Sequence, residues 1–96
     1  MRYRAALVAW EDDPQGGRWI APMPDGPIGR LEGIGPLLLD VLAEAGEPLD
    51  AAELTRRLRT YVPDAPDDAE QIVEEFLPLM ARLGVVTAEE QKGGAA

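Results

Sequence analysis

The sequence predicts an α+β fold in which a three-stranded antiparallel sheet at the N-terminus is followed by three helices. Two short apolar runs flank a segment rich in Pro and Gly, a pattern typical of a β-hairpin. Beyond it, three longer segments carry Leu, Val and Ile at the spacing of one helical face. With 96 residues, the chain is long enough for one modest core and too short for two.

The predicted strands are short and are bounded by turn residues. Residues 4–10 and 18–23 form the two arms of the hairpin, and each arm carries one tryptophan. We interpret Trp10 and Trp19 as a cross-strand aromatic pair that stabilises the hairpin, with a role in stacking against a peptide as the alternative. A third, edge-type strand is expected over residues 27–31, where apolar residues alternate with small or charged ones.

Three helices are predicted over residues 35–45, 51–61 and 68–83, each with apolar residues on one face. Two valines then return the chain to an extended form. The tail over residues 87–96 has no apolar periodicity, so we expect it to be disordered. The predicted domain therefore spans residues 1–86.

Start signals support the helix assignments. Pro36 suits the first turn of a helix. Asp50 followed by Glu53 resembles a capping box in front of the second helix. Asp67 followed by Glu70 repeats this pattern in front of the third, where the helix dipole also favours negative charge.

The amino-acid composition favours recognition over catalysis. The chain contains no Cys, His, Ser or Asn, which removes most nucleophiles and the general base used most often near neutral pH. Adjacent acidic residues such as Glu74 and Glu75 point in different directions on a helix, so they do not form an acid pair. We expect no catalytic residue, no metal site and no cofactor.

The net charge of −9 would repel nucleic acid and anionic membrane surfaces. No apolar run approaches the roughly 20 residues that a membrane span needs. We therefore expect a cytoplasmic protein whose partners are proteins or peptides, with no nucleic acid and no membrane among them.

The third helix has a wider apolar surface than packing on one small core requires. Val73, Leu77 and Met80 cluster on one side, and we assign them to the core. A second group lies further round the helix, and we assign it to a binding groove, because a surplus apolar face often marks a binding surface. The alternative is that these residues also belong to the core. The second group consists of Ile72, Phe76, Leu79 and Leu83.

Several segments carry a resemblance to a known family. Residues 30–35 read Arg-Leu-Glu-Gly-Ile-Gly and lead into three leucines. Residues 47–54 lead into the second helix, and residues 72–77 are followed by Leu-Gly-Val-Val at 83–86. Over about residues 5–86, the chain resembles the PqqD-like family. These are small, winged-helix-like peptide chaperones, also called precursor-peptide recognition elements, of ribosomal peptide natural-product pathways.

Two departures from the family pattern are visible. Family members often carry an aromatic residue and then Leu-Asn before the first helix, whereas Gly29-Arg30-Leu31-Glu32 stands here. Pro78 interrupts the third helix and is expected to bend it near Glu74.

The resemblance implies a binding function without catalysis. In the family, the leader of a precursor peptide adds as a strand to the open edge of the sheet, beside the third helix, and is presented to a separate modifying enzyme. Arg30 would pair with an acidic leader residue or serve only as a charged edge that opposes aggregation. The implied peptide-binding residues are Ile28, Gly29, Arg30, Leu31, Ile72, Phe76, Leu79 and Leu83.

Two other functions fit the same sequence less well. The chain could be a non-catalytic interaction subunit whose groove is filled by a partner protein. It could also be a winged-helix DNA-binding regulator, with the second and third helices as helix-turn-helix. Its recognition helix would then carry the acidic residues Asp67, Asp68, Glu70, Glu74 and Glu75, which would meet phosphates with like charge.

Overall fold

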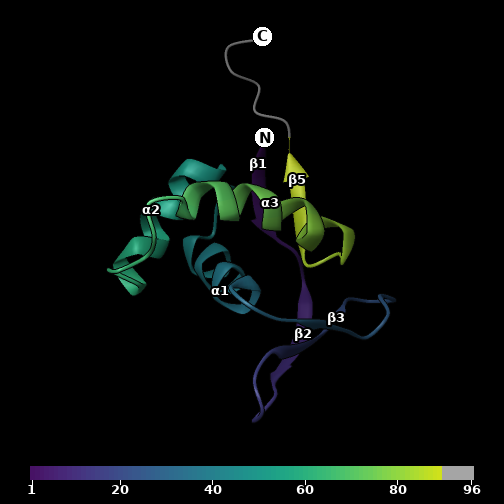
Figure 1. Cartoon of the computed structure of the whole chain (residues 1–96). Coiled ribbons are helices and arrows are strands. Elements are labelled where there is room, and N and C mark those ends of the chain that lie inside the picture. The colour runs from purple at the N-terminus through teal and green to yellow at the C-terminus, as the bar shows by residue number, and fades with distance from the viewer. Residues whose placement is uncertain (90–96) are drawn as a thin grey trace, which may run out of the picture.

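The computed structural model describes residues 1–89 of the chain. Its strands and helices follow the predicted order, strands first and then three helices (Figure 1). The α+β fold class is therefore confirmed. The elements are β1 (Arg2–Ala5), β2 (Val8–Asp12), β3 (Arg18–Pro22), β4 (Gly29–Leu31), α1 (Gly35–Ala45), α2 (Ala51–Tyr61), α3 (Ala69–Arg82) and β5 (Val86–Glu89).

The predicted three-stranded antiparallel sheet is present, with strand order β2-β3-β4. β2 and β3 form the hairpin, and β4 pairs with the far side of β3. Among the described residues, β2 and β4 are consequently the two edges of this sheet. Figure 1 shows the hairpin lying below the three helices.

A second sheet was not predicted. The run expected as one strand over residues 4–10 is divided between β1 and β2, because the two halves pair with different partners. β1 pairs antiparallel with β5, so that Ala5 lies opposite Val86. The expectation of disorder is wrong for residues 87–89, which belong to β5, and residues 90–96 lie outside the described part of the chain.

The first two helices begin and end where their sequence signals lie. α1 has Pro36 in its first turn and ends at Gly46, whose φ of 67° few other residues adopt easily. In front of α2, the Asp50 carboxylate accepts a hydrogen bond from the Glu53 backbone N–H, and the Glu53 carboxylate accepts one from the Asp50 N–H. The predicted capping box is thus confirmed.

The start of α3 differs from the prediction. The helix begins at Ala69, and Asp68 at its N-cap makes no side-chain capping bond. The capping pattern predicted for Asp67 and Glu70 is therefore wrong. The helix continues through Pro78, which has no N–H to donate to the Glu74 carbonyl.

The core lies where the helices meet the inner faces of the two sheets, and Val86 of β5 belongs to it. Val73, Leu77 and Met80 of α3 are fully buried there, as predicted. Ile20 and Leu31 contribute the side of the same core that belongs to the β2-β3-β4 sheet. None of the helices in the described part of the chain is long and apolar enough to span a membrane.

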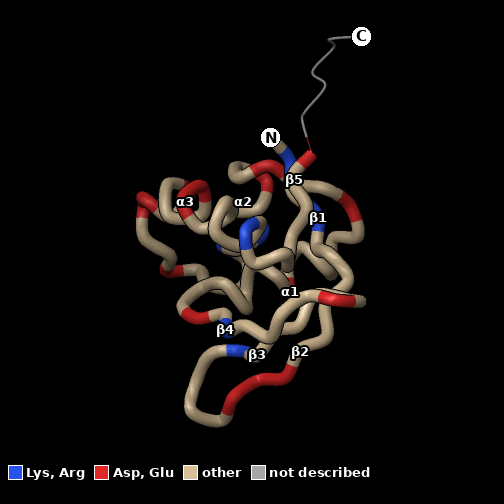
Figure 2. The backbone as a smooth tube through the Cα atoms, turned by 90° about the vertical axis from the view of Figure 1, so that its right-hand side faces the viewer, with Lys and Arg blue, Asp and Glu red and all other residues tan. Residues whose placement is uncertain are grey.

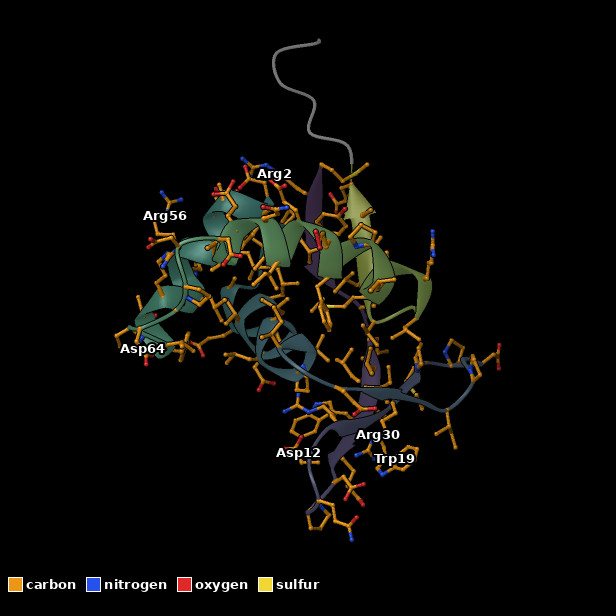
Figure 3. The ribbon with its side chains drawn as sticks, in the orientation of Figure 1. Arg2, Asp12, Trp19, Arg30, Arg56 and Asp64 are labelled. Atoms are coloured by element: carbon orange, nitrogen blue, oxygen red, sulfur yellow. The ribbon has the colours of Figure 1, made fainter. Side chains whose placement is uncertain are left out.

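The two tryptophans do not form the predicted cross-strand pair. Trp10 lies opposite Ile20, and Trp19 lies opposite Glu11, so the two rings are on opposite faces of the sheet. Each ring instead packs against a guanidinium, Trp10 at 3.9 Å from Arg18 and Trp19 at 5.0 Å from Arg30. Figure 3 shows Trp19 and Arg30 together on the hairpin side of the molecule.

A buried arginine joins the sheet to α1. The Arg18 side chain is only 5% exposed and lies 2.7 Å from Asp12 of β2 and 2.7 Å from Asp40 of α1. Hydrogen bonds to Asp40 raise the pKa of Arg18 above its ordinary value, so its charge is permanent. Nothing in the sequence pattern singled out this residue, because an Arg on a short strand is usually exposed.

Candidate functional site

A groove lies between the edge strand β4 and the helix α3. Its volume is about 280 Å³, and it continues along the loop that joins β4 to α1. We call it the β4–α3 groove. It is lined by Arg30, Leu31, Glu32, Gly33, Phe76, Leu79, Met80 and Leu83.

The groove has a buried apolar floor and an exposed apolar wall. Leu31 and Met80 form the floor and are almost fully buried. Leu79 and Leu83 form the wall and are 49% and 39% exposed. Large apolar side chains at this exposure lose contact with water when an apolar partner covers them, so the wall favours binding.

Two glycines allow Phe76 to lie close to the loop at the end of the groove. A Cβ on Gly33 would lie 3.7 Å from the Phe76 ring, and the φ of Gly33 is +63°. A Cβ on Gly35 would lie 2.6 Å from the Leu31 side chain and 3.0 Å from the ring. Gly33 is favoured by its positive φ, whereas Gly35 is favoured because a side chain there would collide with Leu31 and Phe76.

Most of the predicted peptide-binding residues meet at this groove. Arg30, Leu31, Phe76, Leu79 and Leu83 line it. Gly29 lies at its end, where an added Cβ would be 4.0 Å from Leu83.

Two predicted residues lie elsewhere. Ile28 is 77% exposed and faces a shallow hollow on the outer face of the sheet, beside Trp19. Ile72 lines a separate hollow between the helices.

Sequence reasoning missed three lining residues, Glu32, Gly33 and Met80. The sequence predicts Met80 as a core residue only, whereas the structure places it both in the core and at the groove floor. The Gly-Ile-Gly sequence at 33–35 was the signal for Gly33, since closely spaced glycines after a strand indicate a close approach of backbone to a neighbour.

Arg30 is held by groups of its own chain. Its guanidinium lies 2.7 Å from Asp13 and 3.5 Å from Glu32, and it donates to the carbonyl of Gly16. The hydrogen bond from Arg30 lowers the pKa of Asp13, helped by the Gln15 backbone N–H. These contacts favour a structural role for Arg30, which ties β4 to the tip of the hairpin. Figure 2 shows the acidic run at the end of β2 and the basic positions on β3 and β4.

Two charged residues of opposite sign, Arg30 and Glu32, are among those that line the groove. The Glu32 side chain is 71% exposed on the loop side. Glu75 and Arg82 are exposed on α3 but are not among the lining residues. The site is therefore an apolar groove with a charged border of mixed sign, and among the described residues no group of His, Cys, Asp and Glu is arranged to hold a metal ion.

Comparison of the chain with protein-family models, with curated proteins and with solved structures found no significant match. The geometry of the groove and the sequence motifs are therefore the features that indicate its function.

Proposed function

We propose that this protein binds the leader region of a ribosomally made precursor peptide by strand addition and presents it to a separate modifying enzyme. The observation that carries the proposal is the position of an edge strand, β4, directly beside an apolar groove. An edge strand offers unpaired N–H and C=O groups to an extended peptide, and the groove accepts its alternate side chains.

The dimensions of the groove suit a short extended segment. From Phe76 to Leu83 the helix rises about 10 Å, at about 1.5 Å per residue. An extended peptide covers that length in about three residues. β4 itself has three residues, so strand and groove match in length.

The sequence motifs support the same proposal. The Gly-Ile-Gly segment that shapes the groove and the Leu-Gly-Val-Val segment that ends α3 are among those that resemble the PqqD-like family. On this proposal the chain acts in the cytoplasm, carries no cofactor and catalyses no reaction alone, since it lacks Cys, His and Ser.

The exposed face of α3 argues against a DNA-binding regulator. Glu70, Glu74 and Glu75 are exposed on this helix, which would be the recognition helix of a helix-turn-helix. Three carboxylates at a phosphate backbone would oppose binding. An interaction subunit for a folded partner would use the same groove, and a test of peptide binding separates the two.

Synthetic N-terminal segments of short peptides encoded beside the gene provide the test. We expect one of them to bind the wild-type protein and to bind the Leu79→Ser variant at least about tenfold more weakly, because Leu79 forms the exposed wall. Leu7→Ser is the matched control, since Leu7 is 78% exposed and lies outside the groove. A gene neighbourhood without a short peptide, or equal binding by both variants, would contradict the proposal.

A further inference from the structure

A second apolar hollow lies at the other end of α3, between the three helices. Its volume is about 90 Å³, and every residue that lines it is apolar. We call it the helical hollow. Among its residues are Ile34, Leu37, Val62, Ala65 and Ile72. Ile72 stands at its rim and is 38% exposed, so the hollow is open to solvent.

Hydrogen bonds hold the rim of the helical hollow in place. The loop between α2 and α3 contributes Ala65 and Pro66, and Arg59 donates to the carbonyls of both at 3.2 Å. The Ala65 N–H also donates to the carbonyl of Val62 at 3.0 Å. The hollow is therefore preformed, which lowers the entropy cost of filling it.

The helical hollow lies next to the β4–α3 groove along α3. Ile72 and Phe76 are one helical turn apart on α3, the first in the hollow and the second in the groove. On the opposite side, Gly33 lines the groove and the next residue, Ile34, lines the hollow. A peptide that leaves the groove along α3 meets the hollow next.

We infer that the helical hollow binds one branched aliphatic side chain of the same peptide, and this inference rests on the proposed function. Its size selects the occupant. Pockets for small molecules usually measure about 300–1,000 Å³, and an apolar cavity of about 150 Å³ holds a benzene ring. At about 90 Å³ the hollow is smaller than both of these, and its size suits one aliphatic side chain such as Val, Leu or Ile.

The lining excludes polar occupants. A hydroxyl, amide or charged group in the hollow would lose its hydrogen bonds to water, and no lining side chain could replace them. The peptide is therefore expected to require an aliphatic residue at one fixed position.

The geometry also predicts how far this aliphatic residue lies along the peptide from the residue that contacts Leu79. Leu79 lies in the groove, and Ile72 lies seven residues before it on the same helix, which corresponds to about 10 Å. An extended peptide covers this distance in about three residues. If the peptide adds antiparallel to β4, as β3 does, the aliphatic residue lies on the N-terminal side of the paired segment.

A displayed library of random peptides, selected separately on several variants of the full chain, tests the inference. Ile72→Ser removes the apolar rim, and Ala65→Leu fills the hollow without adding a polar group. Leu79→Ser disables the groove, and Leu7→Ser is the remote control. Circular dichroism melts establish that each variant is folded before selection.

We expect peptides selected on the wild type to carry Val, Leu or Ile about three residues from the segment that pairs with β4. Their affinity should fall about tenfold for Ile72→Ser and for Ala65→Leu, because each prevents burial of one aliphatic side chain. Replacing that aliphatic residue with Ala should weaken binding to the wild type by a similar factor and leave binding to Ile72→Ser unchanged.

The other outcomes overturn the inference in distinguishable ways. Peptides that need Leu79 but bind equally to Ile72→Ser and Ala65→Leu would leave the proposed function intact and overturn the inference alone. A change of oligomeric state in Ile72→Ser without loss of peptide binding would show that a second copy covers the hollow. Failure to select any peptide that depends on Leu79 would overturn both.

Discussion

The guanidinium of Arg30 lies 2.7 Å from the carboxylate of Asp13. This contact joins the edge strand β4 to the tip of the β2–β3 hairpin across the outer face of the sheet. The Trp19 ring lies against the same guanidinium. The strand that we propose as the docking edge is thus held by side chains as well as by its pairing with β3.

The contact between Arg30 and Asp13 predicts how the stability of the fold depends on pH. Because Arg30 lowers the pKa of Asp13 below its ordinary value of 3.8, the carboxylate stabilises the fold fully above that pH, and its contribution is lost as the pH falls through the lowered pKa. Arg30→Met should raise the pKa of Asp13 toward 3.8. Carboxyl carbon shifts in an NMR titration measure this directly, and identical titrations in both proteins would contradict the contact.

Two leucines of α3 should differ sharply when replaced. Leu77 is 1% exposed in the core, so Leu77→Ala should destabilise the fold by about 2–5 kcal/mol. Leu79 is 49% exposed, so Leu79→Ala should change stability by no more than about 0.5 kcal/mol. Urea unfolding of both variants tests the division of α3 into core and groove faces. A large loss for Leu79→Ala would mean that the groove wall is part of the core.

Replacement of Phe76 does not separate the core face of α3 from its groove face. Its side chain is half-buried, and its ring packs against Gly33 and Gly35. Phe76→Ala is therefore expected to reduce both stability and peptide binding, rather than binding alone.

Burial of the Arg18 guanidinium should destabilise the fold strongly only when its carboxylate partners are removed. The double variant Asp12→Ala/Asp40→Ala leaves a guanidinium that is 5% exposed without a carboxylate. We expect a loss of about 3 kcal/mol, at the low end for a broken buried pair because both carboxylates are about half exposed. Adding Arg18→Met should recover most of this loss, since an apolar side chain needs no partner. Equal stability of the double and triple variants would contradict this account.

The N-cap residues observed at α2 and α3, Asp50 and Asp68, provide a matched pair. Asp50→Ala removes a capping box that is present and should cost about 1 kcal/mol. Asp68→Ala removes an N-cap residue that makes no capping bond and should cost no more than about 0.5 kcal/mol. Thermal or urea unfolding compares the two. Equal losses would show that the Asp68 carboxylate caps α3 in solution.

Local signals explain which parts of the fold could be predicted. The bounds of α1 and α2 follow from caps and periodicity that lie within a few residues of each helix. The hairpin and β4 follow from turn residues and alternation. The pairing of β1 with β5 could not be predicted in this way, because it joins the two ends of the described chain and leaves no local pattern.

Local signals also explain why the groove could be predicted only in part. The surplus apolar face of α3 can be counted from the sequence, and Phe76, Leu79 and Leu83 do line the groove. How that face is divided between the β4–α3 groove and the helical hollow could not be predicted from the sequence. The division depends on where the β4–α1 loop and the α2–α3 loop meet the helix. Ile72 shows this, since it belongs to the same stripe and lies in the helical hollow.

Backbone amide exchange with a bound peptide tests the central claim most directly. A groove-dependent peptide should slow exchange at the outward-facing amides of residues 28–31, because a peptide strand on β4 would accept their hydrogen bonds. The β2 edge, Val8–Asp12, should exchange as in the free protein. Protection confined to β2, with none at residues 28–31, would show that the peptide uses the other edge and would contradict strand addition at β4.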